Sequence, residues 1–155
     1  MTDFQQTQNI PSHRIRIFEW ILAILGTINC IVIPVIYLIS YYSSGVIGDI
    51  WPFPLLYFIE ITLLGLLPLI ALGMIGNDPI SKWLGVPWTC SGILVAFVIL
   101  GAWTIGFYFI PAMITFLITG ILVDKRLQGD IALHIIFFVS AGIGQAVFVL
   151  ISLLG

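Results

Sequence analysis

Charged residues are scarce in this chain: Asp, Glu, Lys and Arg together make up 8% of its 155 residues, whereas hydrophobic residues make up 61%. The mean hydropathy of +1.20 lies far above the range of soluble globular proteins. The net charge is only -2 and the five basic residues are scattered, so the chain offers no basic surface for nucleic acid. These shortages indicate an integral membrane protein whose first partner is the lipid bilayer.

Sequence motifs of known chemistry are also missing. The chain has no P-loop, no dinucleotide fingerprint, no G-x-S-x-G elbow and no H-E-x-x-H helix. His13 and His134 are the only histidines, too few for a metal or haem site. Cys30 and Cys90 form no C-x-x-C pair and are expected at different depths, which argues against a disulfide. We therefore expect no enzyme activity, no metal and no cofactor.

Apolar stretches of membrane-spanning length alternate with short polar segments. Period-two alternation is absent, so these stretches are expected to be helices and not strands of a barrel. The first stretch is longer than the apolar core of about 7 to 15 residues in a signal peptide, so we expect it to remain as an anchor. We predict a short polar cytoplasmic tail over residues 1–14 and a single transmembrane domain over 15–155. This all-α domain is predicted to be a bundle of five transmembrane helices over residues 15–41, 54–75, 84–103, 107–123 and 131–154.

Residues 85–123 form one unbroken apolar run, and its division decides the topology. A single helix of this length, at a rise of about 1.5 Å per residue, would be about 55 Å long, against a hydrocarbon core of about 30 Å. Two glycines weaken the helix between residues 101 and 106, so we expect helices 3 and 4 to form a tight hairpin near Thr104–Gly106. Pro111 then falls near the start of its helix. The alternative is four spans with a long, kinked third helix, which is acceptable where protein covers the kink.

The basic residues favour the five-span topology and orient it. Cytoplasmic loops of membrane proteins are enriched in Lys and Arg. Five spans with the N-terminus inside put all five basic residues on the cytoplasmic side, whereas four spans would put Lys125 and Arg126 outside. We therefore predict a multi-pass protein of the plasma membrane or a bacterial inner membrane, with its N-terminus cytoplasmic and its C-terminus extracytoplasmic.

Four polar residues from four different predicted helices are expected at nearly one depth, when about 1.5 Å is counted for each residue from the nearest helix end. Glu60 is the most informative of them, because an ionised carboxylate inside a membrane is costly and usually faces the bundle interior or a cavity. It could carry a proton or bind a cation, or it could stay neutral or snorkel outward and serve as packing glue. The candidate polar layer consists of Glu60, Asn29, Thr115 and Gln145.

Pairs of small residues lie around these polar groups and mark faces where helices can approach closely, because small side chains at a spacing of four admit a neighbouring backbone. The last predicted helix has such residues on more than one side, so it is either central in the bundle or docks another subunit. A helix-end pair between Glu19 and His134 is a further hypothesis. The candidate packing residues are Gly26, Cys30, Ala102, Gly106, Ser140, Gly142, Gly144 and Ala146.

Two hypotheses about function follow from these observations. The first is a non-catalytic accessory or structural subunit that packs against other membrane subunits or against itself, which fits the small size and the packing faces. The second is a small ion, proton or solute transporter or channel centred on Glu60, formed as an oligomer because five short helices enclose little space.

Overall fold

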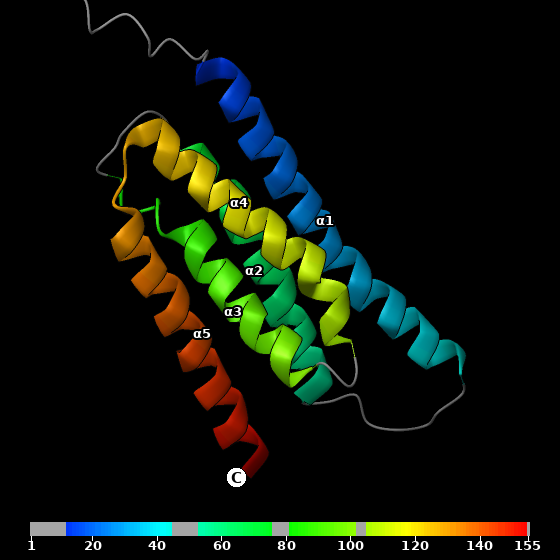
Figure 1. Cartoon of the computed structure of the whole chain (residues 1–155). Helices are drawn as coiled ribbons and strands as arrows, with labels where there is room; N and C mark the ends of the chain where they lie inside the picture. The colour runs from blue at the N-terminus through cyan, green and yellow to red at the C-terminus, as the bar shows by residue number, and fades with distance from the viewer. Residues whose placement is uncertain (1–11, 45–52, 76–80, 102–104, 155) are drawn as a thin grey trace, which may run out of the picture.

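The computed structural model describes residues 12–44, 53–75, 81–101 and 105–154, and the described chain is all-helical (Figure 1). Five α-helices follow one another with short connections, and a 3₁₀ turn precedes the fourth. The elements are α1 (Ser12–Ser43), α2 (Phe53–Ile75), α3 (Val86–Leu100), η1 (Gly106–Phe109), α4 (Ile110–Leu127) and α5 (Ile131–Leu154).

The first four helices form a four-membered ring, and α5 lies outside it. Helix α1 packs against α2 and α4, and α3 packs against the same two helices from the opposite side. Helix α5 packs against the outer face of α3, on the side away from α1 (Figure 1). The last helix is therefore not central in the bundle, which was one of the two alternatives for it.

Two hydrophobic clusters hold the ring together. The larger one lies at the ring axis and draws residues from all four helices and from η1, among them Cys30, Leu94, Phe109 and Phe116. The smaller one closes the end of the ring where α1 begins and α2 ends, around Ala23 and Ile75. Outside these clusters most large apolar side chains are exposed, which is the pattern of a bundle with a lipid-facing surface.

The long apolar run divides as predicted, into two helices joined by a reversal. Gly101 ends α3, and the Gly106 amide donates a hydrogen bond of 2.7 Å to the Gly101 carbonyl. A Cβ added to Gly106 would lie 2.5 Å from the Gly101 carbonyl carbon, so the close reversal requires glycine. Thr104 and Ala102 lie outside the described residues, and Pro111 falls in the first turn of α4 as predicted.

Several helix bounds differ from the predicted ones. Helix α1 begins at Ser12, inside the predicted tail, and α3 is shorter than predicted at 15 residues. Helix α4 continues beyond Val123 to Leu127, a segment that the sequence pattern had assigned to a loop. The other four α-helices, with η1 counted into the fourth span, are long and apolar enough to cross a membrane, and α3 is below that length.

A proline inside α2 lies within one turn of a contact with α1. Pro68 has no backbone N–H, so it cannot donate the helical hydrogen bond to the carbonyl of Leu64. The hydroxyl of Thr27 donates a hydrogen bond of 2.6 Å to the neighbouring carbonyl of Gly65. A Cβ on Gly65 would lie 2.6 Å from Cβ of Cys30, so the two helices approach most closely here.

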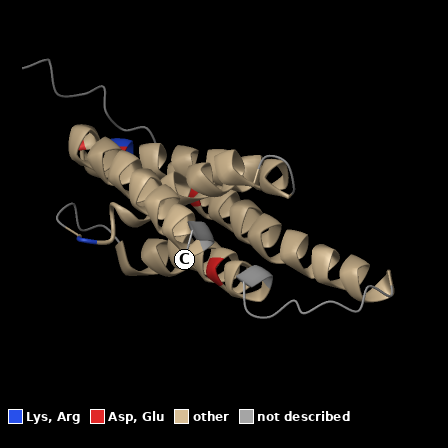
Figure 2. Ribbon diagram, turned by 90° about the horizontal axis from the view of Figure 1, so that it is seen from below, with Lys and Arg blue, Asp and Glu red and all other residues tan. Residues whose placement is uncertain are grey.

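The charged residues divide unevenly between the two ends of the bundle. Arg14 and Arg16 begin α1, Lys82 precedes α3, and Lys125 and Arg126 end α4. These positions all lie at the end of the bundle where α1 and α5 begin, and the basic residues visible in Figure 2 lie at one end. We call it the basic end; the other is the opposite end.

Candidate functional site

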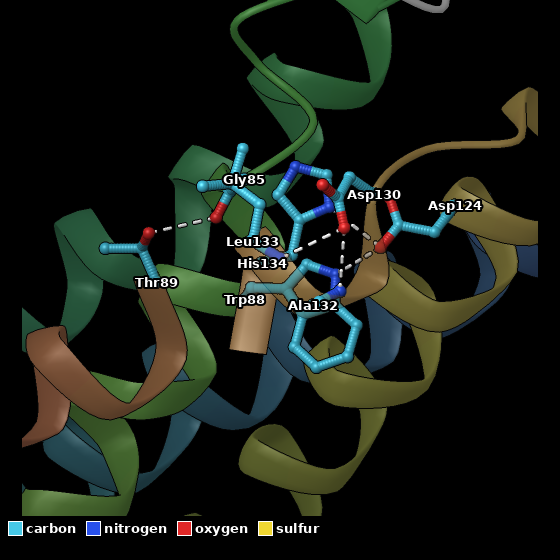
Figure 3. Close-up of polar contacts among 8 residues, drawn as sticks. All are labelled: Gly85, Trp88, Thr89, Asp124, Asp130, Ala132, Leu133 and His134. Atoms are coloured by element: carbon cyan, nitrogen blue, oxygen red, sulfur yellow. Dashed lines mark hydrogen bonds and ion pairs between the residues drawn. The ribbon is translucent and has the colours of Figure 1, made fainter. Parts of the chain in front are cut away.

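The last turn of α4 brings the side chains of Asp124 and Arg126 into the basic end. Gln128 ends this helix in the left-handed conformation, with φ 56°, and the Gly129 amide donates to the Asp124 carbonyl at 3.0 Å. Asp130 then caps α5, because its Oδ1 accepts from the amides of Ala132 and Leu133 (Figure 3). This tight connection fixes α4 and α5 relative to each other at the basic end.

Asp124 is the centre of a buried polar cluster that joins three helices (Figure 3). Its Oδ2 accepts a hydrogen bond of 3.0 Å from Trp88 Nε1 on α3 and lies 2.9 Å from His134 Nδ1 on α5. The rings of Trp88 and His134 stack at a centroid distance of 6.4 Å. All three side chains are buried, and the other oxygen, Oδ1, has no hydrogen-bond partner among the described residues. The cluster is a polar clamp between α3, α4 and α5.

A second buried contact joins α1 to α4. Arg126 Nε donates to Glu19 Oε1 at 2.8 Å, and Nη2 donates to Oε2 at 3.0 Å, which is the two-pronged geometry of a strong guanidinium–carboxylate pair. The Glu19 side chain is completely buried. The predicted helix-end pair of Glu19 with His134 is therefore wrong: Glu19 pairs with Arg126, and His134 pairs with Asp124, because α4 extends one turn further and brings both partners inward.

The predicted polar layer is divided between two grooves. Glu60 and Gln145 line one groove, between α2 and α5, whose volume is about 540 Å³. The Gln145 amide lies beside the Glu60 carboxyl, but its buried Nε2 completes no hydrogen bond. Asn29 and Thr115 line the other groove, between α1 and α4, where Thr115 Oγ1 donates to the Ala112 carbonyl and Asn29 Oδ1 has no partner. The structure thus brings the four residues together in pairs.

One of the two predicted small-residue faces of α5 packs against α3, and the other is exposed. Gly142 faces α3, where a Cβ would lie 2.9 Å from the Gly92 carbonyl oxygen, and Ala146 lines the same seam. A Cβ on Gly92 would collide with the Phe138 carbonyl, so the two backbones touch at this crossing. Ser140 and Gly144 are exposed, and a Cβ on Gly144 would meet nothing within 4 Å. One face is used inside the chain and the other is open.

The other predicted packing residues that the structure describes lie at contacts within the ring, and Ala102 is outside the described residues. Gly26 faces α4, where a Cβ would collide with the ring of Phe116, and Cys30 faces Gly65 of α2. Gly106 packs inside the hairpin, against the backbone of Gly101 and Phe97 at the end of α3. Cys30 and Cys90 are free and share the central cluster, so they are nearer to each other than the predicted depths implied.

The residues that sequence reasoning missed are Asp124, Arg126 and Trp88. A signal for Arg126 exists in the sequence: Glu19 lies within an apolar stretch near the basic end, where a buried acid needs a cationic partner. Among the described residues, no three His, Cys, Asp or Glu side chains gather as metal ligands would. The hydrogen bonds of Asp124 join α3, α4 and α5.

Comparison of the chain with protein-family models, with curated proteins and with solved structures finds no match. The fold defines a class all the same: a helical bundle with four helices that are long and apolar enough to span a membrane. Function within that class has to be inferred from the residues of the chain itself.

Proposed function

We propose that this chain is a five-span membrane protein that acts as a non-catalytic accessory subunit of a larger membrane complex. In this proposal the basic end faces the cytoplasm, in a plasma membrane or a bacterial inner membrane, because cytoplasmic segments are enriched in Lys and Arg. The up-and-down order of the helices then puts the C-terminal end of α5 outside. Helix α3, at 15 residues, crosses inside the bundle, where α2, α4 and α5 surround it.

The observation that carries this proposal is the placement of α5. This helix attaches to the rest of the chain through α3, and only His134 and Val149 of its described residues are buried. Its outer face combines exposed apolar side chains with the open pair Ser140 and Gly144. Such a pair at a spacing of four lets a second transmembrane helix approach closely. We therefore assign the outer face of α5 to a helix of a partner subunit.

The rival hypothesis of a transporter or channel centred on Glu60 has less support. Fully or nearly fully buried side chains of Leu94, Phe109 and Phe116 fill the axis of the ring. The candidate polar residues lie in two separate lateral grooves, so one chain does not align them along one path. A path for an ion or solute would have to form between several copies of the chain.

The proposal is tested by purifying the tagged protein from its native membrane in a gentle detergent and identifying what migrates with it. We expect a stoichiometric partner that Gly144→Leu removes, because leucine fills the open face of α5. Gly73→Leu is the matched control: a Cβ on Gly73 of α2 also meets nothing within 4 Å, so this variant should keep the partner. Purification of the wild-type chain without any partner would contradict the proposal.

A further inference from the structure

The groove between α2 and α5 is the part of the structure that the proposed docking face does not use. Its two walls come from different helices: Tyr57 and Glu60 lie on α2, and Gln145, Phe148 and Ser152 lie on α5. Its volume of about 540 Å³ falls in the range of about 300 to 1,000 Å³ that is usual for small-molecule sites. The groove lies toward the opposite end, since Glu60 is near the start of α2 and Ser152 is near the end of α5.

The chemistry of this groove combines one acid with apolar and aromatic walls. Tyr57 is held in place from the side of α3, because its ring packs edge-on against Phe97 at a centroid distance of 5.9 Å. The ring of Phe148 belongs to the facing wall and is 58% exposed, so it is free to contact a ligand. The Gln145 side chain on the facing wall lies beside the Glu60 carboxyl. An occupant thus meets a carboxylate, an amide and two aromatic rings.

Glu60 has no cationic partner within the described chain. Glu60 is partly buried, whereas the two fully buried carboxylates have partners: Glu19 pairs with Arg126, and Asp124 contacts Trp88 and His134. The basic side chains lie at the basic end, at the far side of the bundle from this groove. An ionised carboxylate at membrane depth is costly without a counter-charge, so a positive charge brought by an occupant is favoured here.

We propose that this groove binds a monovalent, amphipathic organic cation, whose positive group pairs with Glu60 and whose apolar body lies against Tyr57 and Phe148. The ring faces add cation–π attraction to the ion pair. Calcium and magnesium ions do not fit, because they take about six or more oxygen ligands and the groove has one carboxylate. Both a soluble lipophilic amine and the amine headgroup of a lipid have the required chemistry. The site does not depend on the partner subunit.

The test is a calorimetric titration of the purified full chain in a non-ionic maltoside detergent with tetraphenylphosphonium, a lipophilic cation. We expect saturable binding of one cation per chain, at least ten-fold weaker in Glu60→Gln. Asn29→Leu, in the other groove, is the matched control and should bind as wild type does. Equal melting temperatures of wild type and Glu60→Gln would establish that both are folded; if Glu60→Gln does not fold, Glu60→Asp and the neutral probe below replace it.

The neutral probe is triphenylphosphine oxide, which has a similar apolar body and no net charge. The inference holds if it binds at least ten-fold more weakly than the cation. Equal binding of the two probes, or equal cation binding by wild type and Glu60→Gln, would overturn it and would mean adsorption to apolar surface only. Nanodiscs then distinguish the sources: competition by added phosphatidylethanolamine identifies a lipid amine, whereas unchanged cation affinity identifies a soluble one.

Discussion

Arg126 pairs with Glu19 across 107 positions of the chain, and this ion pair ties the end of α4 to the beginning of α1. Both side chains are withdrawn from the surface, with 8% and 0% exposure. A buried pair of this kind gives little net stability compared with apolar residues of the same size, but losing one partner leaves an unpaired buried charge. The Glu19–Arg126 pair therefore fixes the register of α1 against α4.

Glu19→Ala is expected to lower the stability of the bundle by about 3 to 5 kcal/mol, the usual cost of breaking a buried pair on one side. The measurement is the unfolding midpoint of the purified protein in detergent. The double variant Glu19→Ala, Arg126→Leu should recover much of the loss, because it leaves no buried charge. A single variant as stable as wild type would contradict the structural role of the pair.

Trp88 and His134 are expected to be coupled through Asp124, since both contact the same carboxylate oxygen. Trp88→Phe keeps an aromatic ring but removes the indole N–H, and a hydrogen bond to a carboxylate is worth about 1.5 to 3 kcal/mol. A double-mutant cycle of Trp88→Phe with His134→Phe should give a coupling energy of about 0.5 to 3 kcal/mol in unfolding experiments. Strictly additive effects would show that the two side chains act independently.

Gly92→Ala is expected to force α5 away from α3, because its Cβ would collide with the Phe138 carbonyl. Overpacking of this kind costs about 1 to 3 kcal/mol. Gly144→Ala is the matched control on the open side of α5 and should be neutral or slightly stabilising, since alanine favours a helix. Thermal unfolding of the two variants compares them directly, and equal stability would exclude the close crossing at Gly92.

Single cysteines are expected to report the five-span topology, through labelling of intact cells with a membrane-impermeant maleimide. Cysteine at Tyr42 or Tyr108, which are 74% and 61% exposed at the opposite end, should be labelled from outside. Cysteine at Lys82 or Lys125 should be labelled only after permeabilisation. Native Cys30 and Cys90 are buried and should stay unlabelled. Labelling of Lys125→Cys from outside would support the four-span alternative instead.

The sequence allowed the helices to be predicted because their cause is local. Long apolar runs, glycines at 101 and 106 and a proline at 111 place the helices and the hairpin with errors of a few residues. The position of α5 outside the ring could not be predicted in this way. It depends on which of two small-residue faces of α5 packs against α3. Both faces, Gly142 with Ala146 and Ser140 with Gly144, have the same pattern of small residues at a spacing of four.

The buried contacts of Asp124 and Arg126 were not predicted because the end of α4 was placed too early, at Val123. Hydropathy falls after Val123, so the pattern places Asp124 and Arg126 in a loop. Helix α4 continues because Trp88, His134 and Glu19, from three other helices, satisfy these two side chains in its last turn. Only tertiary contacts carry that information. The same limit applies to Glu60 and Asn29, whose helical positions were predicted but whose grooves depend on how neighbouring helices are rotated.

The central claim is that the open face of α5 docks a partner helix, and photo-crosslinking in native membranes tests it most directly. A photoreactive phenylalanine analogue is placed at Gly144 and, as the control, at Gly73, which is equally open on α2. We predict one discrete protein adduct from position 144 and lipid adducts alone from position 73. Lipid adducts alone from both positions would contradict the claim and leave the face of α5 to the bilayer.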